Sequence, residues 1–275
     1  MLAENIDIYA LGHESAISIE SRRMEQAGSA EVIYLSNRLK KNPPKRPNNQ
    51  SEERWVDPIR DKADIHKCLE YLKSRYYYSS RKDMRDAALR NYLLFVVGIN
   101  VGLRVSDLTA LRWSNLYEPD METFIDAKNK REKKTKKMKV ICPNTPIKEA
   151  VQFYRSCIDA QPEYDDFVFM PTQKSEDHLK TGAVEYMMKN VAKACSLKGN
   201  YNTHSLRKTY AYQLYMSYTN AGDQFSLVKV QRALNHRNAQ ETICYLGFTR
   251  DQLIKDSQSL GDWLELDIPE TSEYY

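Results

Sequence analysis

The sequence predicts an α+β protein that is mainly α-helical and carries one small antiparallel β-hairpin. From Trp55 onward, most of the longer stretches carry apolar side chains at helical spacing. Two shorter strand-like runs, Thr123–Ala127 and Lys137–Cys142, flank a lysine-rich tip. Runs of this length on either side of a polar tip are typical of an antiparallel pair.

Length and composition restrict the class of protein. A chain of 275 residues holds one large domain, or a medium domain with a smaller attachment. A hydrophobic content of 41% with 28% charged residues is typical of a soluble globular protein. No apolar run has the length of a membrane span and the N-terminus has no signal-peptide pattern, so we expect a cytoplasmic protein without a membrane partner. Five cysteines without CxxC pairing indicate reduced thiols rather than a disulfide frame or a zinc site.

A linker near residue 50 divides the expected domains. Residues 40–50 contain three prolines, three asparagines and no large apolar side chain, which is the composition of an extended linker. We therefore expect a short N-terminal segment with this linker over residues 1–50, and the main domain over residues 51–275. Within the segment, Glu14–Met24 has helical character, and Ser29–Leu39 suits a short helix or a strand.

Two long helices are expected to open the main domain. Asp61–Tyr78 has an apolar stripe, and Arg85–Asn100 is apolar enough to be a central buried helix. Gly102 is expected to end the second helix as its C-cap. Ser106 is then expected to cap a short helix through residues 106–113.

The second half of the chain predicts shorter helices around one extended run. In order, they are Thr145–Ile158, Thr181–Cys195, Thr203–Met216, Ser226–Leu234 and Ala239–Tyr245. Thr145 is expected to cap the first of them, with Pro146 following it. Phe167–Met170 suits a short extended run. A last amphipathic segment, Gln252–Leu266, needs a partner for its apolar face, either its own domain or a neighbouring protomer.

Positive charge is concentrated in two places. The net charge is only +4, but Lys128–Lys139 holds eight Lys or Arg residues and Arg38–Arg46 holds five. Clusters of this kind commonly contact phosphate backbones, although a solvated loop has the same composition.

One short segment, Thr203–Arg207, indicates an anion site. Thr203 is expected to be the N-cap of a helix, which places His204 and Arg207 three residues apart on its first turn. Free backbone N–H groups and the helix dipole favour an anion there. An imidazole beside a guanidinium suits a phosphate. The full candidate set is Arg104, Lys134, His204, Arg207, His236 and Tyr245.

These side chains together suit the cleavage of a phosphodiester. Two arginines can grip the non-bridging oxygens and offset the charge of the transition state. Tyr245 is a nucleophile that would form a covalent phosphotyrosine, with His204 taking or returning its proton. Lys134, near the hairpin tip, can protonate the leaving 5′ oxygen, and His236 can donate to the same phosphate or orient the tyrosine. No Asp/Glu cluster with metal-ligand spacing accompanies them, so we expect a reaction without metal or cofactor.

In order and spacing, these residues resemble the catalytic domain of tyrosine recombinases of the phage-integrase type. The resemblance runs from Trp55 to Leu266. Gly102–Leu108 resembles the first arginine box, Glu132–Thr135 the hairpin lysine, His204–Arg207 the His-x-x-Arg box, and Leu234–His236 with Tyr245 the second histidine and the nucleophile. Two positions depart from the pattern. Asn235 stands where the family usually has glycine, and Cys142 where it commonly has proline.

The resemblance implies a site-specific DNA recombinase or integrase of a mobile element. Tyr245 would attack the scissile phosphate of double-stranded DNA, leaving a 3′-phosphotyrosyl bond and a free 5′ hydroxyl. A homo-oligomer on DNA, from dimer to tetramer, would rejoin the exchanged strands. The family also carries a helical core-binding domain of about 100 residues, so the resemblance predicts that this domain is truncated or absent in residues 1–50.

Three alternatives stay open at the level of sequence. A DNA-binding regulator of the phage-repressor kind would keep the fold without recombining. A type IB topoisomerase-like enzyme would use the same chemistry without a defined site. Within the hairpin, other lysines compete with Lys134 for the catalytic role, namely Lys130, Lys133, Lys136 and Lys137.

Overall fold

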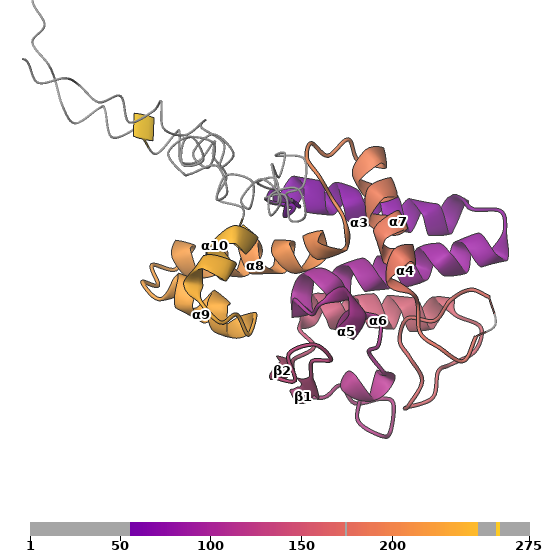
Figure 1. Cartoon of the computed structure of the whole chain (residues 1–275). Helices are drawn as coiled ribbons and strands as arrows, with labels where there is room; N and C mark the ends of the chain where they lie inside the picture. The colour runs from indigo at the N-terminus through magenta and orange to yellow at the C-terminus, as the bar shows by residue number, and fades with distance from the viewer. Residues whose placement is uncertain (1–55, 174, 247–256, 259–275) are drawn as a thin grey trace, which may run out of the picture. The chain divides into compact units, whose positions relative to one another are not determined.

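A computed structural model describes residues 56–173, 175–246 and 257–258 of the chain. In this part, α-helices pack against one another, and a single two-stranded antiparallel sheet lies at one edge of them, which confirms the expected fold class (Figure 1). The expected N-terminal elements, the linker and most of the last amphipathic segment lie outside the described residues. No helix in the described part is long and apolar enough to cross a membrane. All five cysteines are free thiols.

The two long helices α3 (Lys62–Tyr78) and α4 (Lys82–Val101) are close to their expected bounds. α3 begins after Asp61, whose carboxylate accepts a hydrogen bond of 2.8 Å from the amide of Ala63. α4 lies at the centre of the main apolar cluster, as its composition predicts. It ends at Gly102, which has φ +61°. A Cβ added there would lie 2.1 Å from a ring carbon of Tyr210, so glycine is required.

The short helix after Gly102 differs from its expected form. α5 spans Val105–Leu108, and Arg104, rather than Ser106, is its N-cap residue. The carbonyl of Arg104 accepts bonds from the amides of residues 107 and 108, so the helix begins directly after it. The helix then ends early, because the amide of Leu111 bonds to the carbonyl of Leu108 and closes a turn. The 3₁₀-helix η3 (Trp113–Asn115) follows.

The hairpin consists of β1 (Lys128–Arg131) and β2 (Met138–Ile141), paired with Lys128 opposite Ile141. β2 lies inside the expected run, but the expected first strand, Thr123–Ala127, is wrong: the first strand comes directly after it. The tip between the strands is therefore residues 132–137.

The reason lies in the loop before β1. The carboxylate of Asp120 accepts bonds from the amides of Glu122 and Thr123, which turns the chain. Phe124 then stacks on Tyr117 with ring centroids 4.3 Å apart. This run thus pairs with the residues that follow η3 instead of entering the sheet: Phe124 forms an isolated bridge with Tyr117, and the amide of Ile125 donates to the carbonyl of Leu116.

The middle of the chain supplies α6 (Thr145–Cys157) and α7 (Thr181–Ala194), both close to their expected bounds. The cap of α6 is Asn144 rather than Thr145, since the Asn144 side chain accepts from the amide of Ile147. The expected extended run at Phe167–Met170 forms only an isolated bridge, between Phe167 and Arg112.

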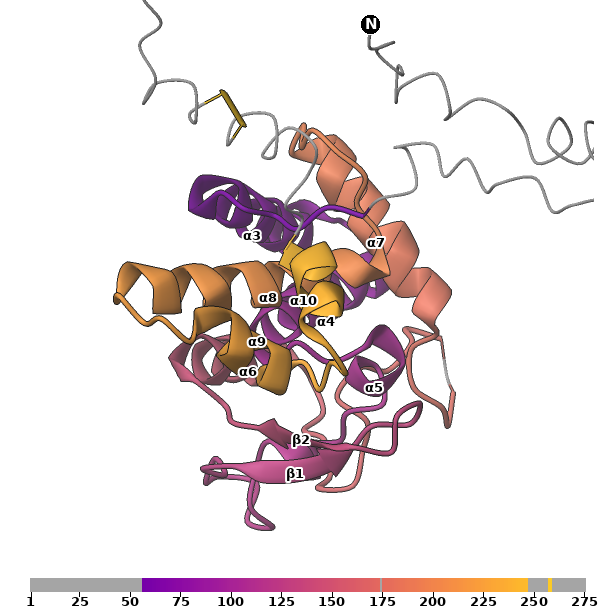
Figure 2. The ribbon, with the colours of Figure 1, turned by 60° about the vertical axis from the view of Figure 1, so that its left-hand side comes forward.

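The last helices form a second packing unit. α8 (Thr203–Asn220) is four residues longer than expected, and α9 (Ser226–Ala233) and α10 (Ala239–Leu246) match their expected ranges to within a residue. A small cluster formed by Ala211, Val230, Leu234 and Leu246 packs α9 and α10 beside α8 (Figure 2). This packing brings the ends of α9 and α10 toward the start of α8.

Candidate active site

The first turn of α8 is set by Asn202. Its side chain accepts a hydrogen bond of 2.8 Å from the amide of His204, and its own amide donates to the hydroxyl of Ser205. Asn202 is therefore the N-cap, and the expectation of Thr203 was wrong by one residue, because the asparagine oxygen reaches the free amides first. His204 and Arg207 remain on the first turns of the helix, His204 exposed and Arg207 buried.

Arg207 ties three helix ends together. Its side chain is 1% exposed, and its NH1 donates to the carbonyl of Gly102 at the end of α4, 2.8 Å away. Its NH2 donates to the carbonyl of Leu234 after α9, 2.6 Å away. Its Nε is buried and has no hydrogen-bond partner in the described part of the chain. An unpaired buried donor costs about 1–3 kcal/mol, which suits a position where a ligand oxygen is to bind.

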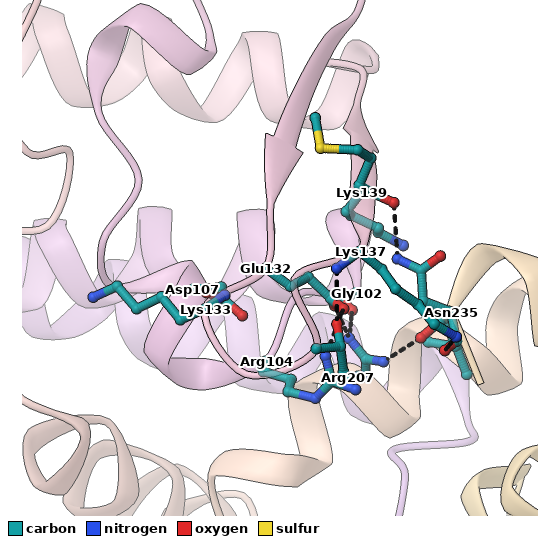
Figure 3. Close-up of polar contacts among 12 residues, drawn as sticks. Gly102, Arg104, Asp107, Glu132, Lys133, Lys137, Lys139, Arg207 and Asn235 are labelled. Atoms are coloured by element: carbon teal, nitrogen blue, oxygen red, sulfur yellow. Dashed lines mark hydrogen bonds and ion pairs between the residues drawn. The ribbon is translucent and has the colours of Figure 1, made fainter. Parts of the chain in front are cut away.

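Arg104 and Arg207 meet at one buried carboxylate, that of Glu132 (Figure 3). Arg104 NH1 lies 2.7 Å from Glu132 Oε2, and Arg207 NH1 lies 3.4 Å from Oε1. Carboxylates and phosphates are the groups that guanidinium forks match. The two arginines are thus close enough to contact a single phosphate.

Glu132 was not among the candidate residues. It is the single acid between Lys128 and Lys139, and this was a signal for it in the sequence. Burial alone would raise its pKa, but the hydroxyl of Thr135 and then Arg104 and Arg207 outweigh burial, so the pKa is lowered. The carboxylate is therefore ionised at neutral pH.

A second buried acid, Asp107, holds the hairpin tip. Its Oδ1 accepts a bond of 2.9 Å from the amide of Lys133. Asp107 follows Arg104 by three residues, across the single turn of α5. The candidate arginine and the lysine-rich tip are therefore fixed to the same short helix.

His236 and Tyr245 lie ring to ring. Their centroids are 4.7 Å apart and the rings meet edge to face. The Cζ of Arg207 lies 5.9 Å from the centroid of the tyrosine ring, which places the ring of the candidate nucleophile beside that arginine. The His236 Nδ1 lies 3.0 Å from the hydroxyl of the fully buried Thr242, another residue missing from the candidate set. Thr242 belongs to the same helical face as Tyr245, three residues away, which was the only signal for it.

Electrostatics keep both histidines neutral. Burial, and then Arg207, lower the pKa of His236 to about 4. The pKa of His204 is also lowered: partial desolvation contributes most, although the residue is exposed overall, and the cations Lys208, Arg207, Arg104 and Lys134 add to it. A neutral imidazole at pH 7 can accept a proton, as a base must.

Lys134 lies on the tip and is exposed. Its charge acts on His204, so the tip and the start of α8 share one electrostatic environment. Two competing lysines donate to backbone carbonyls, Lys130 to Ala110 and Lys137 to Asn235. Lys133, Lys134 and Lys136 remain exposed on the tip, and of these Lys134 is the one whose charge acts on His204.

The structure thus brings all six candidate residues into one neighbourhood, drawn from the α4–α5 junction, the hairpin tip, the start of α8, the end of α9 and α10. Among the described residues, no group of three or more His, Cys, Asp or Glu side chains is placed to hold a metal ion.

Comparisons with known proteins agree on one family. The family model described as "Phage integrase family" matches residues 60–250. The chain is 28% identical over 196 residues to the probable integrase/recombinase YoeC of Bacillus subtilis (strain 168), which covers 71% of this chain and 92% of that protein. It is 29% identical over 170 residues to the tyrosine recombinase XerC of Pediococcus pentosaceus, covering 60% of this chain and 52% of that protein.

The fold matches that of solved recombinases. The XerH site-specific recombinase bound to palindromic difH substrate, in a post-cleavage complex, has a TM-score of 0.52 with 17% sequence identity. The match covers 76% of this chain and 55% of that one. The chain therefore spans about half the length of XerH and of XerC, and the likeness to XerH is a likeness of fold.

Proposed function

The chain belongs to the phage integrase family, and we propose that it is a site-specific recombinase that cleaves and rejoins double-stranded DNA through a 3′-phosphotyrosyl intermediate. One observation carries the proposal: Arg104 and Arg207 converge on a single carboxylate, and Arg207 lies beside the ring of Tyr245. Two guanidinium groups at this separation, with a tyrosine side chain beside one of them, suit attack of that tyrosine on a phosphodiester.

Each side chain has a defined part in the proposed reaction. The Tyr245 hydroxyl oxygen bonds to the phosphorus while the bond from phosphorus to the 5′ oxygen breaks. His204 accepts the tyrosine proton, and Lys134 gives a proton to the leaving 5′ oxygen. The product is a 3′-phosphotyrosyl bond and a free 5′ hydroxyl. Rejoining runs the same steps in reverse with a 5′ hydroxyl from another strand.

The transition state carries more negative charge than the phosphodiester, and the site is arranged to offset it. Arg104 and Arg207 provide two fixed positive charges, and the buried Nε of Arg207 is a donor that awaits an oxygen. His236, neutral at pH 7, can donate one hydrogen bond to the phosphate without adding charge. No step requires a metal or a nucleotide cofactor.

DNA is the proposed partner, and the lysine-rich hairpin supports it. Exposed positive charge next to the candidate site suits contact with a phosphate backbone. Exchange of strands needs two broken duplexes, so we propose that the chain acts as a dimer or tetramer on DNA.

The test begins by selecting DNA that the full chain binds from a random pool, since no motif names the target. The selected duplex is then nicked next to the cleavage position. Cleavage releases the short fragment that carries the free 5′ hydroxyl, so rejoining is prevented and the covalent adduct is trapped. We expect wild type to form the adduct. Tyr245→Phe should form none while its Kd changes by no more than about twofold, because only the nucleophile is lost.

Each other outcome has a meaning. An undiminished adduct with Tyr245→Phe would refute the assignment of the nucleophile. A shifted but never trapped duplex with wild type would point to a DNA-binding regulator. A pool that yields no consensus, together with relaxation of supercoiled plasmid, would point to a topoisomerase-like activity.

A further inference from the structure

Three consecutive carbonyls at the end of α9 each accept a hydrogen bond from a cationic side chain. The pairs are Lys139 with Ala233, Arg207 with Leu234, and Lys137 with Asn235. In the opposite direction, the Nδ2 of Asn235 donates to the carbonyl of Met138, 2.9 Å away (Figure 3). The strand β2 and the turn that precedes His236 are therefore bonded to each other in both directions.

We propose that Asn235, Lys137 and Lys139 are positioning residues that hold the hairpin, residues 128–141, against the turn that precedes His236. This turn, Leu234–Asn235, is called the histidine turn below. The effect of the three residues is to hold Lys134 and His236 in a fixed relation, so that both reach the same phosphate. This inference rests on the proposed function, because that function gives the two residues their shared target. None of the three positioning residues is required to touch DNA.

The backbone at Asn235 makes glycine a clean test of the side-chain contact. Its φ is +56°, a left-handed conformation that asparagine tolerates better than most residues. Glycine would adopt it without strain, and the turn itself is closed by backbone bonds from the amides of residues 235 and 236 to carbonyls of α9. What asparagine adds over glycine is the bond to Met138.

Lys139 also supports a link between β2 and the end of α9. The burial pattern of β2 alternates, and Lys139 occupies an inward position next to the equally inward Ile141, where an apolar side chain is the norm. It is 5% exposed, and its ammonium lies 4.9 Å from the ring centroid of Tyr210. Burial lowers its pKa to about 8, so holding the charge there is costly. The ammonium is stabilised there by its hydrogen bond to the carbonyl of Ala233, which lies at the negative end of the α9 dipole.

The tip is thereby anchored on both sides. On one side the amide of Lys133 bonds to Asp107, and on the other Lys137 bonds to the histidine turn. Lys134 is next to the first anchor and three residues from the second, and His236 directly follows Asn235. Releasing the second anchor would leave Lys134 held from one side only.

The first experiment compares Asn235→Gly with wild type in the full chain. Glycine relieves the backbone and removes only the side-chain bond. Ser196→Gly is the matched control, because Ser196 also has a positive φ, +54°, and lies after α7, outside the site. We expect amide hydrogen exchange in residues 132–139 to accelerate about tenfold in Asn235→Gly, and to stay at the wild-type rate in Ser196→Gly.

The second measurement is cleavage of the nicked duplex in a single turnover. Asn235→Gly should cleave about tenfold more slowly with a Kd within about twofold of wild type, since alignment and not binding is lost. Unchanged exchange at the hairpin would overturn the proposal, and so would accelerated exchange with an unchanged cleavage rate. If wild type itself forms no adduct, the proposed function fails, and the exchange experiment still tests the coupling by itself.

A double-mutant cycle with Asn235→Gly and Lys139→Met tests whether the two residues act together or independently. Lys139→Met keeps most of the buried volume and removes the bond to Ala233. If both residues act together, the double variant should cleave only about as slowly as the worse single variant. Multiplication of the two effects, to about a hundredfold loss, would show independent roles and refute the shared role.

Discussion

Arg104 and Arg207, which lie far apart in the chain, share the two oxygens of the Glu132 carboxylate. The contact fixes the separation of the two guanidinium groups before any DNA is bound. It also neutralises part of their charge, so the carboxylate both organises the site and competes with the phosphate that the site is proposed to bind.

Glu132→Gln should destabilise the protein by about 3 kcal/mol, because it leaves the buried Arg207 and the partly buried Arg104 without their counter-charge. The amide has the size of the carboxylate, so packing is preserved. Urea unfolding measures the loss, and added sulfate should recover part of it, since an anion can take the place of the carboxylate. Glu149→Gln, at an exposed position of α6, is the control: its free energy of unfolding should equal that of wild type and should not respond differently to sulfate. A variant as stable as wild type without sulfate would contradict this account of the carboxylate.

His236 should make the stability depend on pH below neutrality. Its pKa is about 4 in the folded protein and about 6.5 in the unfolded chain, so the unfolded chain binds the proton first as pH falls. The free energy of unfolding contributed by this group is fully present above pH 6.5 and decreases by about 3 kcal/mol on the way to pH 4. Unfolding in urea at pH 7 and pH 4.5 for wild type and His236→Gln should show that dependence shrink in the variant. Parallel curves for the two proteins would place the titration elsewhere.

Lys134 is assigned to the leaving oxygen, and that assignment has a chemical test. Lys134→Met should slow cleavage of an ordinary duplex about a hundredfold, which is the usual contribution of a general acid. A substrate with sulfur at the 5′ bridging position releases a thiolate that needs no proton, so the variant should cleave it nearly as fast as wild type. Lys136→Met, a neighbour on the same tip, is the control for lost charge. An equal defect on both substrates would assign Lys134 to binding instead.

The helices were predictable from the sequence because each has its own apolar stripe and its own end signals. Their first residues were less so. At α6 and α8 two adjacent residues can both act as caps, and the asparagine took the role each time, since its oxygen reaches the free amides. Backbone geometry decides which of the two adjacent side chains reaches the free amides, and the sequence does not show that geometry.

The first strand of the hairpin was hidden by its composition. β1 is Lys-Asn-Lys-Arg, without an apolar residue. Its inward positions are held by polar contacts instead, with Lys128 donating to the carbonyl of Ser114 and Lys130 to that of Ala110. A pattern search for alternating apolar residues therefore finds the preceding loop and misses the strand.

The six candidate residues could be predicted because their residue types and order together suggest a reaction. The residues that support them could not. Glu132 and Thr242 contact the site only after distant segments have packed. A single acid in a basic run and a threonine on the face of Tyr245 were their only sequence signals, and neither signal assigns a part in the site. Asn235 was visible as a departure from the family pattern, but its bond to Met138 appears only in the folded chain.

Thr242 should orient the imidazole of His236. Its hydroxyl is buried and 3.0 Å from Nδ1, so it fixes the ring and leaves the other nitrogen for the phosphate that the site is proposed to bind. Thr242→Val keeps the shape of the side chain, removes that partner and leaves Nδ1 unpaired, at a cost of about 1–3 kcal/mol. We expect cleavage to slow about tenfold or more while the Kd for DNA stays near the wild-type value, because only the alignment of one donor is lost. Thr219→Val, exposed at the end of α8, is the control. The NMR signals of the His236 ring should broaden or shift in Thr242→Val alone, and a variant that cleaves at the wild-type rate with a displaced ring would show that His236 does not act on the phosphate.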